Sequence, residues 1–333
     1  MNVEIIAELA QGFEGRPEQA RILLKAAAAA GADAAKFQLV YADELATPDY
    51  MYYSLFQSLE MPDEVWEGLA AYALELGIKM QLDIFGIRSL NLANKIGVST
   101  VKLHGTDISN LGLLNQVANS SVNKVLLGAG GAHLSEIEQA IEVLSSKDLV
   151  IILGFQGYPT PNDTNQIARV RLLVQRLVAI HPKLSIGFAD HASPDSPLRY
   201  SLAAIAIGAG ATVIEKHLTL GRLMKLEDHE SALNVEEFFE FTETIRGCMV
   251  ALGFAANVED FGMSDSERGY RKMIRRHIVA SRNLEVGDKI SPSDLILKRT
   301  SADQAITDLS LVYQKTVKQA VSMNFPVLPK DIS

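Results

Sequence analysis

Two histidines each close a short apolar run of the sequence. His191 ends the segment 184–191, and His217 ends the segment 212–217. Runs of this kind, bounded by glycine, are typical of buried parallel strands, and the carboxyl ends of neighbouring parallel strands meet at one edge of a sheet. Two neutral imidazoles that converge there can bind a divalent metal ion. A single histidine in such a position is more often a hydrogen-bonded structural residue, so the metal hypothesis depends on the pair.

Other charged and polar side chains occupy the ends of the predicted strands or the loops just after them. Isolated charges are costly in a buried setting, so their number here indicates a reactive site. The cations could bind an anionic substrate, and the carboxylates could transfer protons. The residues at these positions are Glu8, Lys36, Gln38, Asp83, Lys102, Asp107, Gln156, Tyr158, Asp190, His191, Glu215, Lys216 and His217.

Several of these residues also allow a structural interpretation. Lys36 could be the partner of a carboxylate inside the fold, and Glu8 could neutralise a neighbouring lysine instead of acting as a base. The segment 158–161, Y-P-T-P, is by default only a rigid loop. Asp228 follows the last predicted strand in a loop, where acidic residues are usually just solvated.

The elements that must position these residues alternate regularly along the chain. Eight strand–helix units in about 250 residues predict an α/β fold, a (β/α)₈ TIM barrel over residues 1–253. A doubly wound open sheet is the alternative, but no G-x-G-x-x-G motif follows the first strand. The predicted strands are 3–9, 34–39, 79–84, 100–104, 124–127, 149–154, 184–189 and 212–217. The predicted helices include 17–30, 63–76, 87–96, 134–144, 164–180, 197–208 and 234–252.

The pattern changes after residue 253. Residues 254–273 carry Gly, Asn, Asp and Ser without a regular period and are predicted to be a linker. Short strand-like segments and turns follow over 274–333, a length that can make a small β-rich domain with a modest core. We therefore expect two domains of unequal size, joined by a linker.

Composition limits the partners and the compartment. The chain has 333 residues, of which 48% are hydrophobic, and its net charge of −9 argues against a nucleic acid bound through its phosphates. No apolar run is long enough to span a membrane, and the first residues enter a predicted strand at once. Cys248 is the only cysteine, so no intrachain disulfide can form. We expect a cytoplasmic protein without a membrane partner.

Seven segments, in order along the chain, resemble the motifs of the sialic acid synthase family, the N-acetylneuraminate synthase-like enzymes. The resemblance extends over essentially the whole chain, because residues 275–333 resemble the antifreeze-like domain that follows the barrel in this family. The seven segments are 7–8 with Gly15, 31–38 (G-A-D-A-A-K-F-Q), Lys102 with Asp107, 158–161 (Y-P-T-P), 187–191 (G-F-A-D-H), 210–217 (G-A-T-V-I-E-K-H), and Asp228 and His229 with Ser231.

The resemblance implies a reaction. Enzymes of this family condense phosphoenolpyruvate with an amino-sugar aldehyde, which gives a nine-carbon 2-keto acid and phosphate, and a surface or spore-coat polysaccharide is the expected destination of the product. His191 and His217 would bind Mn²⁺ or Mg²⁺, and the metal ion would polarise the aldehyde oxygen of the aldose.

The resemblance also implies roles for other residues. Glu8 and Asp107 would handle protons or position water. The residues that would bind the two substrates are Lys36, Gln38, Lys102, Tyr158 and Asp228, with the two lysines on the carboxylate and phosphate of phosphoenolpyruvate. A homodimer is implied as well, in which Arg299 of the C-terminal antifreeze-like domain reaches the substrate of the other protomer.

The sequence departs from the family motifs at positions expected to contact substrate or phosphate. Phe13 stands where the family has a histidine, and Gly105, Gly128 and Ala129 stand where it has hydroxyl-bearing residues. Glycine backbone N–H groups can still form an anion site, with an altered geometry. The metal half of the predicted site therefore matches the family better than the phosphate half.

Two other functions are compatible with these residues. One is an aldolase in which an amine forms an imine with a keto acid, and the candidate amines are Lys36, Lys102 and Lys216. The other is a barrel that binds a sugar without turnover, since it has lost the hydroxyls expected to bind phosphate.

Overall fold

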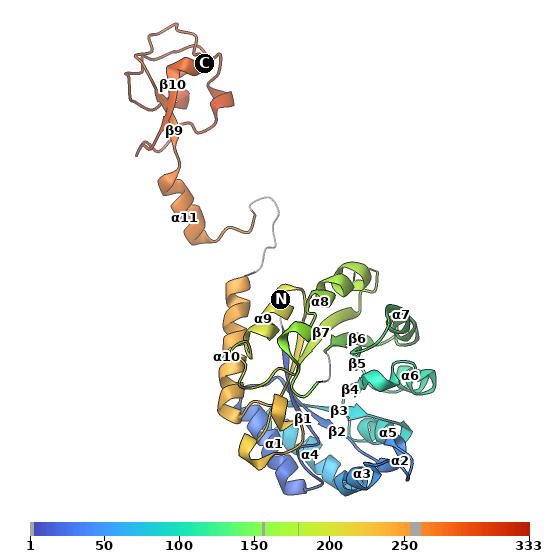
Figure 1. The fold of residues 1–333 in the computed structure, drawn as a ribbon. Helices are drawn as coiled ribbons and strands as arrows, with labels where there is room; N and C mark the ends of the chain where they lie inside the picture. Colours follow the sequence, from blue (N-terminus) through green and yellow to red (C-terminus); the bar gives the residue numbers. More distant parts are fainter. Residues whose placement is uncertain (1–2, 155–156, 179, 254–260) are drawn as a thin grey trace. The chain divides into compact units, whose positions relative to one another are not determined.

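Eight parallel strands close into a barrel, which confirms the predicted fold class (Figure 1). The computed structural model describes residues 3–154, 157–178, 180–253 and 261–333. Consecutive strands pair along the chain, and β8 pairs back with β1 to close the sheet. The strands are β1 (Glu4–Ala10), β2 (Ala34–Gln38), β3 (Lys79–Ile84), β4 (Thr100–Leu103), β5 (Lys124–Gly128), β6 (Asp148–Leu153), β7 (Leu184–Asp190) and β8 (Val213–His217).

Helices cover the outside of the barrel and confirm most of the predicted ranges. The segment 164–180 differs, because its α-helix is short and runs into a π-helical turn at Val174–Val178. Two short helices between β2 and β3 were not predicted. The helices of this part of the chain are α1 (Pro17–Ala29), α2 (Ala42–Leu45), α3 (Tyr53–Leu59), α4 (Asp63–Leu76), α5 (Ile87–Lys95), α6 (Leu111–Ala118), α7 (Leu134–Val143), α8 (Ala168–Leu173), α9 (Ser201–Gly208) and α10 (Val235–Leu252).

The inside of the barrel is layered. At the amino-terminal end of the strands, Glu4 of β1 pairs with Lys124 of β5 across the lumen and accepts a hydrogen bond from Gln81. An apolar layer follows, and a layer of charged side chains lies above it at the carboxyl ends of the strands. Side chains of alternate strand residues fill the lumen in this way in (β/α)₈ barrels, where the carboxyl end carries the active site. The apolar layer consists of Ile6, Ala34, Leu126, Val150, Ile152, Ala189 and Val213.

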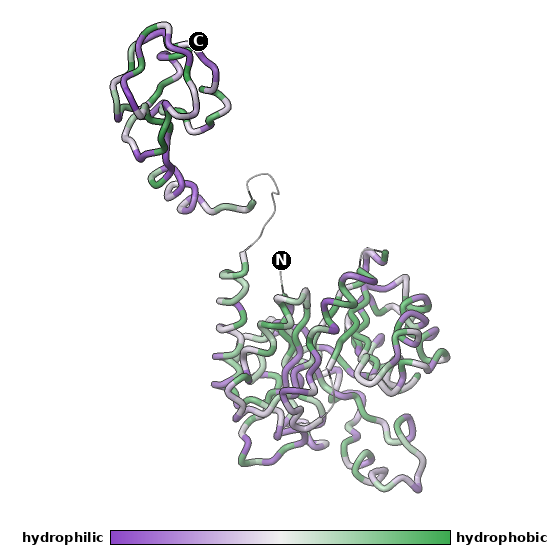
Figure 2. The backbone as a smooth tube through the Cα atoms, turned by 45° about the horizontal axis from the view of Figure 1, so that its top comes forward, coloured by the Kyte–Doolittle hydropathy of each residue, from purple (hydrophilic) through white to green (hydrophobic). Residues whose placement is uncertain are grey.

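The outward-facing strand residues pack against the helices and form the main hydrophobic core. Phe13, Phe37 and Trp66 meet edge to face there, with ring centroids 5.5–6.0 Å apart. The helices accordingly mix hydrophobic and hydrophilic stretches along their length (Figure 2). This packing explains the departure at residue 13, because the Phe13 side chain is completely buried in the core between the barrel and its helices.

Two compact units divide the chain, Met1–Gly253 and Phe254–Ser333. The second unit has its own core around Ile278, Leu284 and Val317, and an antiparallel pair of strands, β9 (His277–Ala280) and β10 (Leu295–Lys298). Its first described element is the helix α11 (Asp265–Ile274), which is largely hydrophilic (Figure 2). Part of the segment predicted as a linker, 254–273, is helical, and 254–260 lie outside the described residues.

Among the described residues, none of the helices is both long enough and apolar enough to cross a membrane.

Candidate active site

Five charged side chains form a buried cluster at the carboxyl end of the lumen. Lys36 of β2 contacts Glu8 of β1, and its Nζ lies 2.6 Å from Oδ1 of Asp83 and 3.7 Å from Oε2 of Glu215. Lys102 of β4 lies 2.6 Å from Oε1 of Glu215 on β8. Because β4 and β8 are on opposite sides of an eight-stranded barrel, this ion pair spans the lumen. We call these five residues the charge cluster.

Burial and mutual attraction set the protonation of the charge cluster. Burial raises the pKa of Glu8 to about 8, and repulsion by Asp83 and Glu215 adds to the effect, whereas Lys36 opposes it. Burial also disfavours the charge of Glu215, but Lys102 and Lys36 outweigh it and lower the pKa of Glu215 to about 2. At neutral pH the carboxyl group of Glu8 is therefore protonated, whereas Glu215 is ionised beside the two lysines.

The structure contains the contact between Lys36 and Glu8 that their structural interpretation requires, and Asp83 is the carboxylate that pairs with Lys36. Lys36 is completely buried, and the attraction of Asp83, Glu215 and Glu8 holds its pKa above the usual value, although burial acts in the opposite direction. Glu8 also accepts a hydrogen bond from the backbone N–H of Ala10, where the register of β1 shifts. Lys36 thus lies within the charge cluster, and its predicted contact with a substrate stays a prediction.

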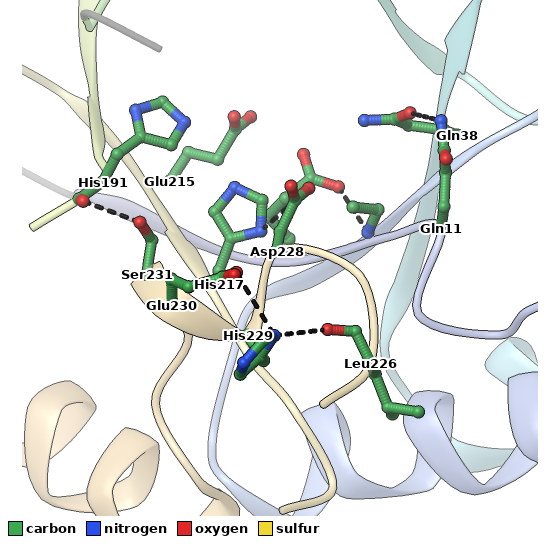
Figure 3. A network of polar contacts seen from close by, with 12 residues as sticks. Gln11, Gln38, His191, Glu215, His217, Leu226, Asp228, His229, Glu230 and Ser231 are labelled. Atoms are coloured by element: carbon green, nitrogen blue, oxygen red, sulfur yellow. Dashed lines mark hydrogen bonds and ion pairs between the residues drawn. The ribbon is translucent and has the colours of Figure 1, made fainter. Parts of the chain in front are cut away.

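His191 and His217 come together as the sequence predicted. Their ring centroids are 5.3 Å apart, and the ring of Tyr158 packs edge-on against both of them. Asp228 lies beside His217, with its Oδ2 3.8 Å from Nδ1 of the ring (Figure 3). Glu215 of the charge cluster is next to this group (Figure 3). The two imidazoles therefore face the same space as the charged lumen.

Burial determines the charge state of this group. It lowers the pKa of His191 to about 3 and holds the pKa of His217 well below the usual value, so both imidazoles are neutral at physiological pH. Burial raises the pKa of Asp228 to about 6, and the neighbouring Glu227 and Glu230 add to this effect. Neutral imidazole is the form that binds metal ions. The Nδ1 atom of His191 is buried and has no hydrogen-bond partner among the described residues.

Two loops that are distant in sequence hold the backbone beside His191. The carbonyl oxygen of His191 accepts hydrogen bonds from the N–H of Thr160, at 2.9 Å, and from the hydroxyl of Ser231, at 2.8 Å (Figure 3). Thr160 belongs to the Y-P-T-P segment, and Ser231 belongs to the segment that starts at Asp228. These contacts bring three segments into one site: the Y-P-T-P segment, the segment that ends at His191 and the segment that starts at Asp228.

A pocket of about 830 Å³ opens across the barrel mouth from the histidines. Gln38 lines it, and its Oε1 accepts a hydrogen bond from Gln11 at 2.7 Å (Figure 3). The pocket combines aromatic rings with carboxylate, amide and hydroxyl groups, a lining that suits a hydroxylated organic ligand. Its lining residues are Gln11, Gln38, Asp43, Glu44, Leu45, Ala46, Thr47, Tyr50, Phe56, Phe85, His104 and Thr106.

Asp107, one of the two predicted proton-handling carboxylates, ends the 3₁₀ turn Gly105–Asp107 that follows β4. Its carboxylate accepts hydrogen bonds from Asn110 at 3.0 Å and from Thr106 at 3.4 Å. Because Thr106 lines the pocket, Asp107 lies next to that pocket rather than within the charge cluster.

The predicted phosphate half of the site is tightly closed by backbone. A Cβ atom added to Gly128 would lie 2.8 Å from the backbone nitrogen of Gly105, and one added to Gly105 would lie 3.3 Å from the carbonyl oxygen of Gly130. Ala129 is buried in the core between the barrel and the helices. The loops after β4 and β5 thus meet where side chains with hydroxyl groups would otherwise stand.

Gly128→Ser is expected to destabilise the protein, because its Cβ requires the Gly105 backbone to move. Forced repacking of this kind costs about 1–3 kcal/mol of unfolding free energy, which urea denaturation would measure. Gly112→Ala is the matched control. Gly112 lies in α6, and a Cβ added there would be in ordinary contact with the side chain of Asn110, at 3.6 Å. An unchanged unfolding free energy for Gly128→Ser would contradict the tight approach of the two loops.

Strand alternation separates residues that the sequence placed together at the barrel mouth. Glu215 and His217 face the lumen, whereas Lys216 between them faces the helices and pairs with Asp190, its neighbour on β7. Asp83 and Glu215 complete the charge cluster, although no specific role could be assigned to either of them from the sequence. Asp83 follows Gln81 by two residues, and Glu215 precedes His217 by two residues. This spacing places each pair on one face of its strand, and it was the signal available in the sequence. Gln156 lies outside the described residues.

The positions of the lysines argue against an imine. An imine-forming amine must lose its proton in contact with the substrate. Lys36 contacts Asp83 within the charge cluster, and its raised pKa favours the ammonium form, while Lys102 is paired with Glu215. Burial lowers the pKa of Lys216, but Lys216 points away from the lumen and donates a hydrogen bond to the carbonyl of Ala192.

Comparisons with known proteins match both units of the chain. The model of the NeuB family matches residues 23–257, and the model of the SAF domain matches residues 275–333. An N,N'-diacetyllegionaminic acid synthase from Legionella pneumophila is 28% identical, over 97% of this chain and 92% of that protein. The spore coat polysaccharide biosynthesis protein SpsE from Bacillus subtilis is 31% identical, over 73% of this chain and 67% of that protein.

A solved structure has a similar fold over the full length of both chains. It is a putative spore coat polysaccharide biosynthesis protein E from Chromobacterium violaceum, with a TM-score of 0.84 at 22% identity and coverage of 100% of each chain. At this identity the likeness concerns the fold alone.

Proposed function

Because this chain belongs to the NeuB family, we propose that it condenses phosphoenolpyruvate with an aldose, to give a sialic-acid-type 2-keto acid and phosphate for a surface polysaccharide. The observation that carries the proposal is the convergence of His191, His217, Asp228 and Tyr158 next to the charge cluster. The names of two relatives, N,N'-diacetyllegionaminic acid synthase and pseudaminic acid synthase, support the reaction type.

We propose that His191 and His217 hold a divalent cation such as Mn²⁺ or Mg²⁺. Two features support this: burial keeps both imidazoles neutral, and Nδ1 of His191 is a buried nitrogen without a hydrogen-bond partner among the described residues. Three or more His, Cys, Asp or Glu side chains that could hold an ion together do not occur among those residues, so substrate and water would complete the coordination. When bound, the cation would polarise the aldehyde oxygen.

The remaining residues would bind and orient the two substrates. We propose that Lys102, the more accessible lysine of the charge cluster, binds an anionic group of phosphoenolpyruvate, and that Lys36 supports it from below. Glu8, whose pKa of about 8 leaves it protonated at neutral pH, can donate a proton as a general acid. Glycine N–H groups of the loops after β4 and β5 would take over phosphate contacts from the missing hydroxyls.

We propose that the aldose occupies the 830 Å³ pocket beside Gln38, with Asp107 close to its edge. Asp228 would hydrogen-bond the sugar near the imidazoles, and Tyr158 would limit the position of phosphoenolpyruvate. Aromatic and polar groups around one cavity favour a ligand with both ring carbons and hydroxyls.

A homodimer is part of the proposal. Arg299 follows β10 in the second unit and is exposed, which leaves its guanidinium accessible to another copy of the chain. We propose that it contacts the substrate of that copy, as in the family that the sequence resembles. Sedimentation that shows a monomer at micromolar concentration would contradict this role.

Phosphate release is expected to require phosphoenolpyruvate, an aldose and a divalent cation together. The experiment incubates the protein with a panel of aldoses and amino sugars, with each component omitted in turn. Chelation should abolish the release and added Mn²⁺ should restore it, because the aldehyde would lose its Lewis acid. Borohydride trapping with pyruvate should leave no adduct. Tight sugar binding without phosphate from any sugar of the panel would contradict the synthase and favour a non-catalytic binding protein.

A further inference from the structure

A buried ion pair lies directly behind the two histidines, on the other face of the same strands. Asp190 of β7 and Lys216 of β8 are neighbours in the sheet, and both side chains are completely buried between the barrel and its helices. The distance from Lys216 Nζ to Asp190 Oδ1 is 3.3 Å. Neither side chain reaches the lumen, so the substrate cannot touch this pair.

The ion pair fixes the backbone on both sides of His191. Oδ1 of Asp190 accepts a hydrogen bond from the N–H of Ala192 at 2.9 Å, and Nζ of Lys216 donates to the carbonyl of Ala192 at 2.9 Å. Asp190 and Ala192 are the two chain neighbours of His191, and Lys216 is the chain neighbour of His217. One closed set of contacts thus joins the backbone of both histidines.

The histidine rings need such support from the backbone. A metal-binding histidine is usually oriented by a hydrogen bond at its second ring nitrogen. Nδ1 of His191 has no hydrogen-bond partner among the described residues and is free for a cation, so the ring is bordered by the packing of His217 and Tyr158 rather than held by a bond at that atom. Its orientation therefore depends on where the backbone places its Cα and Cβ atoms.

We propose that Asp190 and Lys216 are positioning residues, which set the spacing of the His191 and His217 imidazoles through the backbone between them. This inference rests on the proposed function, because the spacing of the two rings matters for cation binding only if they share a cation. The geometry of the rings, however, can be measured without any metal or substrate.

The test compares Asp190→Asn, Lys216→Met and the double variant with the wild-type full-length chain. Asp190→Asn keeps the shape and the acceptor for Ala192 but removes the charge, whereas Lys216→Met also removes the bond to the Ala192 carbonyl. Lys147→Met is the matched control, because Lys147 is likewise a buried lysine that donates to two backbone carbonyls, those of Ser120 and Val122. Urea denaturation confirms that each variant is folded under the conditions used.

The first measurement is the ¹H–¹⁵N NMR spectrum of the histidine rings, with signals assigned from His191→Ala and His217→Ala. The signals of both rings should shift in Asp190→Asn and more in Lys216→Met, and remain in place in Lys147→Met. The second measurement is Mn²⁺ binding by calorimetry, with the metal alone. Variants at the ion pair should bind Mn²⁺ about 10- to 100-fold more weakly than the wild type, the usual effect of removing a group that orients a metal ligand.

The double variant separates positioning from plain stability. Replacing both partners of a buried ion pair can restore stability, yet a positioning role predicts that the ring signals and the Mn²⁺ affinity stay altered. Ring signals that match the wild type in all folded variants would overturn the inference. If the wild type binds no Mn²⁺ but the ring signals shift as expected, the positioning role stands and the metal part of the proposed function fails.

Discussion

Lys36→Met should lower the free energy of unfolding by about 3–5 kcal/mol, the largest stability effect that we expect in this protein. Breaking a buried ion pair by removing one partner has this cost because it leaves uncompensated charge in the interior. Without Lys36, the carboxylates of Asp83 and Glu215 would share the single cation of Lys102. Urea denaturation followed by circular dichroism would measure the change.

Adding Asp83→Asn to Lys36→Met should recover part of the lost stability, since it removes one of the uncompensated carboxylates. Lys95→Met is the matched control, because Lys95 pairs with Glu67 at 2.7 Å on the surface, where an ion pair contributes little. If Lys36→Met were no less stable than Lys95→Met, the charge cluster would not be a coupled buried network.

His191→Ala and His217→Ala should each lower the rate of phosphate release by about a thousandfold or more. Lewis-acid polarisation contributes several kcal/mol to the barrier of a carbonyl addition, and each 1.4 kcal/mol corresponds to about a factor of ten in rate. The fold should survive, since the His191 ring forms no hydrogen bond at Nδ1 that the truncation would break. Single-turnover kinetics with saturating substrates would measure the effect.

His181→Ala provides the comparison for the histidine variants. His181 lies just before β7, at the opposite end of that strand from His191, and its backbone N–H bonds to the carbonyl of Leu177. Its substitution should leave phosphate release unchanged. Wild-type rates for both His191→Ala and His217→Ala would show that the two imidazoles have no part in the reaction.

The strands and their order could be predicted from the sequence because several of the apolar runs end at a glycine or a charged residue, as at Gly105, Gly128, Gly154 and Asp190. The predicted and observed strand bounds differ by no more than one residue, for example 212–217 against Val213–His217. Fold class followed from the count and the regular spacing of these runs. The helix Asp265–Ile274 was missed because it is short and largely hydrophilic, and its apolar residues Tyr270, Met273 and Ile274 occur only toward its end. A Ser264-x-x-Glu267 capping pattern was the available signal.

The partners within the site could not be predicted, because they depend on the stagger of the strands around the barrel. Lys102 and Glu215 are 113 residues apart and meet only when the sheet is closed. The sequence showed that both are at strand ends, but it did not show which charge each lysine would face. Likewise, it suggested lost phosphate contacts at Gly105 and Gly128 without showing that the backbones of the two loops touch.

The contact between Gly105 and Gly128 also constrains the evolutionary paths open to this chain. A hydroxyl-bearing residue at position 128 has no room while the loop after β4 keeps its course, so the benefit of that substitution depends on an earlier change near Gly105. The two positions are therefore epistatic, and the order of substitutions matters. Libraries meant to alter the phosphate half of the site should randomise both loops at once, since single-site libraries would discard each useful residue as a folding defect.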